Sequence, residues 1–340
     1  MHEWSLLGKP GPMGPSPHQP PGPHQPPGLS TERAPRVLVA PERPAFAVDA
    51  VRQGGGELAE YGEAVDALVW VKFNINGLRE TIVDHPGIRW VQLPVAGIES
   101  FVETGIFSAA SSDDVVWTCA KGTYAQHVAE MALGLAIAGL REFPERARAK
   151  TWGGQAGISL YDQPVTVLGG GGITEELLRL LAPLRAHATV VRKTSRPVEG
   201  AERTVGPEDL HSVLPGALVV FLALALTPET VRIISETELA LMGTETWLVN
   251  VARGRHVDTD ALVRYLTERR IGGAALDVTD PEPLPDGHPL WSLPNCLITP
   301  HVANTEKTAP PFLAARIKEN VQRFAAGTTL VGTVDTAAGY

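Results

Sequence analysis

The sequence predicts an α/β protein made of two doubly wound parallel-sheet domains, one inserted in the other. Short apolar runs alternate with helical stretches along most of the chain, which is typical of parallel strands joined by helices. A length of 340 residues favours two such domains over one. The last amphipathic helix has too little chain behind it for a third domain. We therefore expect it to return to the first domain, which makes that domain discontinuous.

The first domain is predicted over residues 36–122 and 306–340. Its strands are expected where the chain is apolar and β-branched: VLVA (37–40), ALVWV (67–71) and RWVQLP (89–94). The closing helix is expected to begin near Pro310 and to end near Gly327. Its apolar side chains recur at helical spacing: Leu313, Ile317, Val321 and Phe324.

The inserted domain is predicted over residues 123–305. Thr123 and Gln126 form a capping-box signature for a long first helix. Thr227 and Pro228 indicate a second helix start. Residues 141–163 read either as a plain surface loop or as a segment in contact with a second subunit. Apolar runs predict the strands of this domain: 165–168, 188–191, 217–223, 247–251, 272–278 and 296–299.

Residues 1–35 are predicted to be a disordered tail. They contain ten prolines and the near-repeat PHQPPGPHQPPG. Such a segment cannot bury enough apolar surface to offset its ordering entropy. It lacks the apolar core of a signal peptide, and no run in the chain approaches the length of a membrane span.

Composition and charge exclude several classes of function. With 44% hydrophobic and 20% charged residues, the chain has the composition of an ordinary globular protein. A net charge of −9 argues against nonspecific binding to nucleic acid or to an anionic membrane, although small anionic substrates are still possible. Cys119 and Cys296 show no metal-ligand spacing, so no metal site is expected. Two unpaired cysteines favour a cytoplasmic protein.

A glycine run predicts a dinucleotide site. It follows an apolar strand and precedes a helical stretch, so its backbone amides can approach a pyrophosphate at a helix N-terminus. Thr174 stands where a third glycine is usual in this fingerprint, and a flexible glycine turn is the alternative interpretation. The predicted cofactor contacts in this loop are Gly169, Gly171, Gly172 and Ile173.

The segment after the next strand indicates which dinucleotide binds. An NAD site needs an acidic residue there to bind the ribose 2′-hydroxyl. Here the segment carries cations and hydroxyls, which suit a 2′-phosphate: Arg192, Lys193, Thr194 and Arg196. NADP(H) is therefore favoured, NAD(H) is possible, and a solvated basic loop is the alternative.

Three polar residues are predicted at the carboxyl ends of strands in the inserted domain. Arg253 follows LVNVA, Glu282 follows ALDVTDP, and His301 follows LITP. Ligands of open parallel sheets bind at this edge, because the loops converge there. A guanidinium that binds a carboxylate, an imidazole that moves a proton and a carboxylate that tunes it suit reduction of a 2-oxo acid. Taken singly, each could be ordinary surface or turn chemistry.

The motifs together resemble the D-isomer-specific 2-hydroxyacid dehydrogenases, a family that includes glyoxylate/hydroxypyruvate reductases and phosphoglycerate dehydrogenases. The resemblance covers about residues 36–330 and depends on the order and spacing of several segments: LPVAGIESF, TYAQHVAE, GGGGIT, ALTPET, VNVARGRHVD, ALDVTDPEPLP and PLWSLPNCLITPH. It implies a Rossmann cofactor domain inserted in a flavodoxin-like substrate domain, hydride transfer between nicotinamide and a small 2-oxo or 2-hydroxy acid, and a homodimer.

The resemblance also implies roles for single residues. Arg253 would bind the substrate carboxylate together with the backbone amides of Val95, Ala96 and Gly97. His301 would exchange the proton, and Glu282 would fix its tautomer and favour its charged form. Asp277 would orient the nicotinamide carboxamide. Further cofactor contacts are expected at Ala225, Thr230, Val251, Ala252 and His301.

Alternatives and departures from the family pattern stay open at this point. A phosphoglycerate dehydrogenase is one alternative, although Lys72 and Arg79 are the only nearby cations for a phosphate in the first domain. A non-catalytic, nucleotide-sensing protein like the corepressors of this fold is another. Glu282 argues against a formate-dehydrogenase-like member, which has glutamine there. The chain departs from the family pattern at Thr174, Ala225, Thr279, Asn304 and Thr305. The substrate side chain is not predicted.

Overall fold

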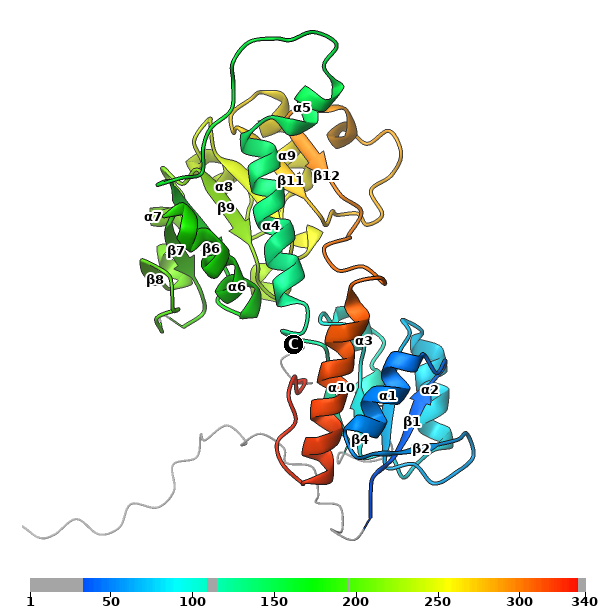
Figure 1. Ribbon diagram of the computed structural model, residues 1–340. Helices are drawn as coiled ribbons and strands as arrows, with labels where there is room; N and C mark the ends of the chain where they lie inside the picture. Colours follow the sequence, from blue (N-terminus) through cyan, green and yellow to red (C-terminus); the bar gives the residue numbers. More distant parts are fainter. Residues whose placement is uncertain (1–32, 109–114, 195, 336–340) are drawn as a thin grey trace, which may run out of the picture.

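The protein folds into two α/β lobes, each built on its own sheet (Figure 1). The computed structural model describes residues 33–108, 115–194 and 196–335. The prediction of a disordered tail over residues 1–35 therefore falls almost wholly outside the described residues. Within the described ranges no helix has the length and apolarity needed to cross a membrane.

The smaller lobe contains a five-stranded sheet in the order β2-β1-β3-β4-β5, with all strands parallel. This is the flavodoxin-like order predicted for the substrate domain. Its strands are β1 (Arg36–Ala40), β2 (Glu57–Ala59), β3 (Ala67–Trp70), β4 (Trp90–Gln92) and β5 (Val116–Thr118), and its helices include α1 (Ala45–Gln53), α2 (Ile75–Asp84) and α3 (Glu99–Glu103). The prediction missed β2, which begins with the exposed Glu57, and β5.

The larger lobe contains a seven-stranded parallel sheet in the order β12-β11-β10-β9-β6-β7-β8. Counted from β6, six neighbouring strands have the 3-2-1-4-5-6 order of a Rossmann sheet. The strands are β6 (Pro164–Leu168), β7 (His187–Val191), β8 (Arg203–Val205), β9 (Val219–Leu222), β10 (Trp247–Asn250), β11 (Gly273–Leu276) and β12 (Cys296–Ile298). Only β8 was not predicted. It is a short edge strand, and Arg203 in it is exposed.

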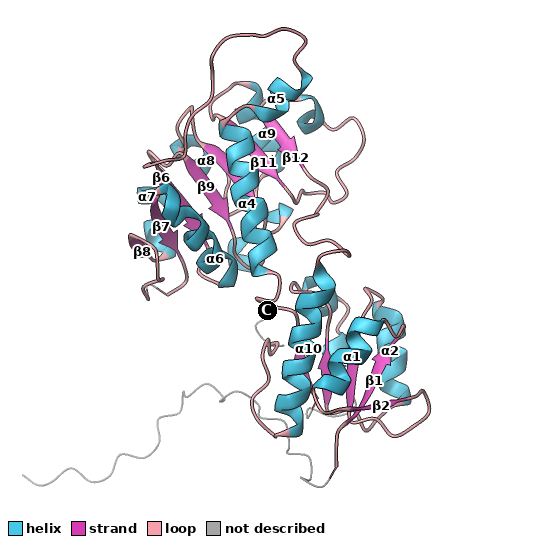
Figure 2. Cartoon of the chain, in the orientation of Figure 1, coloured by secondary structure: helices cyan, strands magenta, loops and turns pink. Residues whose placement is uncertain are grey.

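The first helix of the larger lobe, α4 (Ala125–Leu140), lies on the strand layer (Figure 2). It packs closely on β10, because a Cβ at Gly139 would lie 2.3 Å from the Trp247 ring. The predicted capping box was wrong. The cap residue is Tyr124, without a side-chain cap bond, and the Thr123 hydroxyl is buried without a partner. Residues 141–163 are also not plain loop, since they contain the short helix α5 (Phe143–Arg148).

The segment 227–231 forms only a single 3₁₀ turn, η4 (Pro228–Thr230). Thr227 caps it and Pro228 is its first residue, as predicted for a helix start, but the helix is a 3₁₀ turn rather than an α-helix. The next helix, α8 (Glu236–Leu241), has its own capping box at Ser235. The remaining helices are α6 (Gly172–Leu181), α7 (Leu210–Val213), α9 (Thr259–Thr267) and the 3₁₀ turns η1 (Ile106–Ser108), η2 (Ala182–Leu184), η3 (Pro207–Asp209), η5 (Gly254–His256) and η6 (Pro289–Ser292).

The last helix, α10 (Ala309–Ala325), returns to the smaller lobe, where it lies beside α1 (Figure 1). The four apolar residues predicted to face the core are all buried. A buried polar network also attaches the helix: Asn320 Nδ2 donates to Gln92 Oε1 at 2.8 Å, and Gln92 Oε1 accepts from Thr118 Oγ1 at 3.0 Å. Gly327, with φ +64°, follows the helix end. The smaller lobe is therefore discontinuous, while the limits 123–305 of the insertion stay a prediction.

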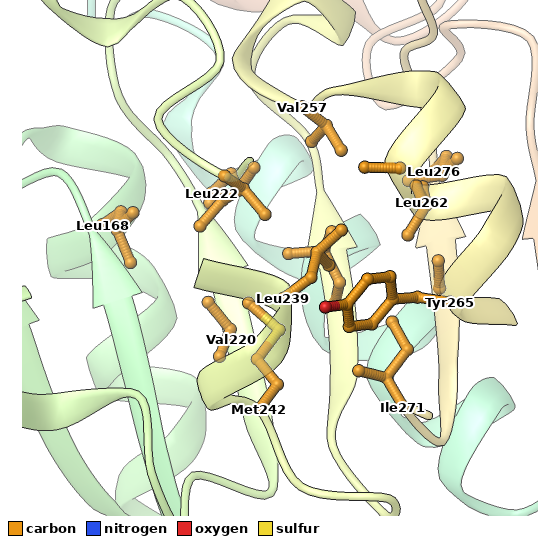
Figure 3. Packing of buried hydrophobic residues seen from close by; sticks show 14 of the residues in the cluster. Leu168, Val220, Leu222, Leu239, Met242, Val257, Leu262, Tyr265, Ile271 and Leu276 are labelled. Atoms are coloured by element: carbon orange, nitrogen blue, oxygen red, sulfur yellow. The ribbon is translucent and has the colours of Figure 1, made fainter. Parts of the chain in front are cut away.

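The core of the larger lobe fixes the strand ends that carry the predicted site. Figure 3 shows Leu239 and Met242 beside Tyr265 and Ile271 in the layer next to the sheet. Tyr265 is fully buried, and its hydroxyl donates to the Glu236 carbonyl at 3.3 Å. Dense packing of this kind holds the loops that follow the strands with little freedom.

Candidate functional site

The predicted polar residues lie in the loops that follow three adjacent strands. Arg253 follows β10, Glu282 follows β11 and His301 follows β12. Because the strands are parallel and neighbouring, their carboxyl ends meet at one edge of the sheet. This edge faces the smaller lobe, since Arg253 forms an ion pair with Glu99 of α3.

Glu282 and His301 form a hydrogen-bonded pair. His301 Nδ1 lies 2.7 Å from Glu282 Oε1, and both side chains are partly exposed. A carboxylate at Nδ1 favours the tautomer with its hydrogen on Nδ1. Nε2 has no hydrogen-bond partner in the described parts of the chain. The imidazole can therefore exchange a proton with a ligand through Nε2.

The turn that carries His301 is held by Asp277. The buried Asp277 carboxylate accepts from Thr299 Oγ1 at 2.6 Å, from the Val302 amide at 2.9 Å and from the Ala303 amide at 2.9 Å. His301 itself has φ +51°, in the left-handed region. Asp277 thus stabilises an unfavourable backbone conformation at a predicted catalytic residue. Its predicted contact with a nicotinamide carboxamide stays a prediction.

The loops of Arg253 and Glu282 are in direct contact. A Cβ at Gly254 would lie 1.9 Å from the carbonyl of Thr279, so only glycine lets the two backbones approach this closely. Thr279 in turn hydrogen-bonds within the Glu282 loop, because its hydroxyl donates to the Pro281 carbonyl at 2.9 Å. The glycine after Arg253 therefore sets the distance between two predicted catalytic residues.

Arg253 is anchored from both lobes. Within the larger lobe its Nη1 donates to the Ala252 carbonyl at 2.7 Å, and Asn250 Nδ2 donates to the Arg253 carbonyl at 2.9 Å. From the smaller lobe, Glu99 Oε1 lies 3.2 Å from Nε and Glu99 Oε2 lies 3.4 Å from Nη2. A second pair on the same helix joins Glu103 to Arg255 at 3.7 Å.

Sequence reasoning missed Glu99 and Glu103. Their i, i+4 spacing was visible, but nothing in the sequence showed that they would meet two arginines 152 or 154 positions away. Only the folded arrangement of α3 against η5 brings these charges together.

The segment 95–97 reaches the same place. A Cβ at Gly97 would lie 1.5 Å from Arg253 Nη2, so the guanidinium lies directly against the Gly97 backbone. Two hydrogen bonds fix this loop: Tyr124 Oη donates to the Pro94 carbonyl at 2.7 Å, and the Ala120 amide donates to the Val95 carbonyl at 2.7 Å. The amides of Val95, Ala96 and Gly97 have no acceptor among the residues that the structure describes. They are thus available to an anion.

The glycine run forms a tight turn between β6 and α6. Gly169 has φ +111°, and a Cβ there would lie 2.2 Å from the Ala223 carbonyl. Gly171 precedes α6, and Gly172 and Ile173 are its first residues. Their amides therefore lie at the N-terminus of this helix, where anions bind. Thr174 is fully buried, and its hydroxyl donates to the Gly169 carbonyl at 3.0 Å. This bond accommodates the departure from glycine.

The basic segment lies beside the glycine turn. The side chain of Arg192 covers Gly170, since a Cβ there would lie 2.7 Å from Arg192 Cδ. Arg192 and Arg196 line a cavity of about 530 Å³ and form no ion pair within the described ranges. Lys193 and Thr194 are exposed next to it. The donor set fits a phosphate-bearing adenosine group.

The other predicted cofactor contacts lie on two neighbouring loops. Thr230 Oγ1 donates to the Ala225 carbonyl at 2.9 Å, and Val251 and Ala252 are buried after β10. His256, which the sequence did not single out, joins these loops: its ring nitrogens lie 2.9 Å from the Thr230 carbonyl and 3.3 Å from the Leu224 carbonyl. Burial lowers the pKa of His256. Because a neutral imidazole has one N–H, the ring then donates to only one of these two carbonyls.

Known proteins resemble this chain along most of its length. A Corynebacterium melassecola protein named "Uncharacterized protein in proB 3'region" is 38% identical over 86% of this chain and 95% of its own length. A glyoxylate/hydroxypyruvate reductase A of Serratia proteamaculans is 29% identical over 64% of this chain and 69% of its own length.

A solved structure gives the same result for the fold. The D-isomer specific 2-hydroxyacid dehydrogenase from Xanthobacter autotrophicus, in complex with NADPH and MES, has a TM-score of 0.75. It is 27% identical, and the similarity covers 90% of this chain and 100% of that one. Residues 131–303 match the family described as "D-isomer specific 2-hydroxyacid dehydrogenase, NAD binding domain". The chain therefore belongs to the D-isomer specific 2-hydroxyacid dehydrogenases and is an NAD(P)-dependent oxidoreductase of 2-hydroxy acids.

Proposed function

We propose that this enzyme is an NADPH-preferring reductase of small 2-oxo acids, of the glyoxylate or hydroxypyruvate type. One observation carries the proposal: the Arg253 guanidinium lies against the backbone of loop 95–97, whose three amides have no acceptor among the described residues, and the hydrogen-bonded pair of Glu282 and His301 follows the two neighbouring strands. Together they supply binding of a carboxylate and transfer of a proton to the neighbouring carbonyl oxygen.

In the reaction, each side chain has a separate task. The guanidinium of Arg253 and the amides of Val95, Ala96 and Gly97 would bind the substrate carboxylate. Bound nicotinamide supplies the hydride that the substrate carbon receives. His301 would donate its Nε2 proton to the carbonyl oxygen and take it back in the reverse reaction. Glu282 keeps the imidazole in the required tautomer through Nδ1.

A panel of 2-oxo acids tests the reaction. With NADPH, the purified protein is expected to reduce glyoxylate or hydroxypyruvate, and the absorbance of NADPH should fall as it is oxidised. Absence of turnover with every member of a broad panel would sink the proposal.

The cofactor preference has its own support and its own variant. Arg192 covers the glycine turn and has no acid partner, which favours a 2′-phosphate over a free 2′-hydroxyl. Arg192→Asp is therefore expected to weaken NADPH binding at least about tenfold more than NADH binding. Arg179→Asp is the matched control, since Arg179 lines the same cavity but pairs with Glu176. Equal effects of Arg192→Asp on both nucleotides would refute the assignment.

A phosphoglycerate dehydrogenase has less support. The two candidate cations for a substrate phosphate are engaged elsewhere: Lys72 pairs with Glu42 at 3.3 Å, and Arg79 donates to the Thr104 carbonyl at 2.8 Å. The nucleotide-sensing alternative has no observation that favours it over catalysis.

Location and assembly complete the proposal. Two free, buried cysteines, Cys119 and Cys296, support a cytoplasmic enzyme. A homodimer is supported by the excursion after α4, where Trp152 is fully exposed and Phe143 is 55% exposed. Exposed aromatic side chains of this size are typical of protein interfaces. Sedimentation equilibrium is expected to give twice the mass of the chain, and a monomer would exclude this assembly.

A further inference from the structure

The Arg253 guanidinium contacts groups of both lobes. Glu99 contacts its Nε and Nη2 edge, and the Ala252 carbonyl takes a hydrogen of Nη1. The guanidinium still has further N–H groups on Nη1 and Nη2 with which to bind a carboxylate. A substrate held there must therefore share the arginine with Glu99.

The Gly97 backbone shows that substrate and Glu99 would be neighbours. A Cβ at Gly97 would lie 1.5 Å from Arg253 Nη2 and 2.6 Å from Glu99 Oε2. The guanidinium, the Glu99 carboxylate and the loop of free amides thus converge at one point. A carboxylate bound by Arg253 and these amides has the Glu99 charge beside it.

The Arg253–Glu99 pair is shielded from water, so the charge of Glu99 can act on a bound anion. The side chains of Arg253 and Glu99 are 31% and 26% exposed, whereas those of Arg255 and Glu103 are 52% and 69% exposed. Charges shielded from water interact more strongly than charges in water. Glu99 should therefore influence a bound anion, and Glu103 should influence it little.

We infer that Glu99 is a specificity-determining residue that selects 2-oxo acids by the charge of the group next to the keto carbon. It repels a second carboxylate and accepts a hydrogen bond from a hydroxyl or another donor. The preferred substrates are then monocarboxylic 2-oxo acids, with hydroxypyruvate favoured over oxaloacetate. This assignment rests on the proposed function, because Arg253 must bind the substrate carboxylate.

A charge-neutral variant tests the assignment in turnover. In Glu99→Gln, the kcat/KM for oxaloacetate divided by that for pyruvate is expected to rise at least about tenfold over the wild type. Glu99→Asp, which keeps the charge, is expected to retain the wild-type discrimination. Glu103→Gln is the matched control on the same helix. An unchanged ratio in Glu99→Gln, or an equal rise in Glu103→Gln, would overturn the inference.

A binding measurement separates this inference from the proposed reaction. Oxamate and oxalate have similar shapes, but oxalate carries a second negative charge where oxamate has an amide donor. Calorimetry with the NADPH complex is expected to show tighter binding of oxamate by the wild type, and a shift toward oxalate of at least about tenfold in Glu99→Gln. If no 2-oxo acid is reduced while this shift appears, the reaction fails and the charge selection stands. If reduction occurs without the shift, Glu99 has no such role.

Discussion

The hydrogen-bonded pair of His301 and Glu282 and the ion pair of Arg253 and Glu99 differ in where their partners come from. His301 and Glu282 both belong to the larger lobe and lie in the loops after adjacent strands. Arg253 belongs to the larger lobe, but Glu99 comes from the smaller one. In the proposed reaction, the groups for proton exchange are therefore placed by the folding of a single lobe, whereas those for recognition of the substrate require contact between the two lobes.

Mutations in the two pairs should therefore affect different steps of the reaction. A change at His301 should affect the chemical step more than it affects nucleotide binding. A change in the contact between lobes should affect the use of substrate, because binding and orientation are completed only when loop 95–97 reaches Arg253. Variants on either side can separate these effects.

Removal of the proton-exchanging group should have the largest effect. His301→Gln is expected to lower kcat by about 10²–10⁴-fold, because glutamine cannot exchange a proton. The affinity for NADPH, measured by calorimetry, should fall far less than kcat, although His301 is also a predicted cofactor contact. The companion variant Glu282→Gln should cost less, since it leaves the imidazole in place. If His301→Gln kept nearly full kcat, the proton donor would have to be another group.

A change in the contact between the two lobes should have the second-largest effect. Gly97→Ala places a methyl group where Arg253 Nη2 now lies, 1.5 Å from the ideal Cβ position. We expect kcat/KM for hydroxypyruvate to fall about 10–100-fold, a loss of ~1.4–2.7 kcal/mol in transition-state stabilisation. The thermal midpoint should stay near that of the wild type. Gly134→Ala is the control, since a Cβ there meets nothing within 4 Å. Equal losses in both variants would contradict the account.

The buried His256 should give the smallest effect, and it should appear in stability. Its pKa is lowered from 6.5 by burial, so the folded protein favours the neutral ring. Stability is then complete above the unfolded pKa and is lost as the pH falls below 6.5 toward the folded value. Urea unfolding at pH ~7.5 and ~5.5 should show a smaller pH-dependent loss in His256→Gln than in the wild type. A steeper loss in the variant would show that His256 does not carry this dependence.

Local patterns were sufficient to predict most of the fold. The apolar runs predicted nine of the twelve strands in the described ranges. The helical spacing of Leu313, Ile317, Val321 and Phe324 predicted the buried face of α10. Two of the missed strands, β2 and β8, begin with an exposed charged residue, Glu57 and Arg203, which interrupts the apolar pattern. The third, β5, is fully buried, and its apolar run was not assigned to a strand. The capping box predicted at Thr123 was wrong because the cap residue of α4 is Tyr124, whose hydroxyl donates to the Pro94 carbonyl. A contact between residues this far apart leaves no local pattern in the sequence.

The site was predictable only where its residues follow strand ends. Parallel strands bring His301 and Glu282 together, and that rule can be applied to a sequence. The roles of Asp277 as a hydrogen-bond acceptor for the His301 turn and of Glu99 as a partner of Arg253 depend on loop conformation and on the placement of the lobes. Neither leaves a periodic signal in the sequence.

The central claim is that the assembled site transfers a hydride and a proton to a 2-oxo acid. A single-turnover experiment tests it most directly: the NADPH complex is mixed with hydroxypyruvate, and both nicotinamide absorbance and products are measured. We predict that each NADPH consumed yields one molecule of glycerate, and that His301→Gln slows this step. If both ligands bind but the NADPH absorbance persists, the protein binds nucleotide without catalysis and the account is contradicted.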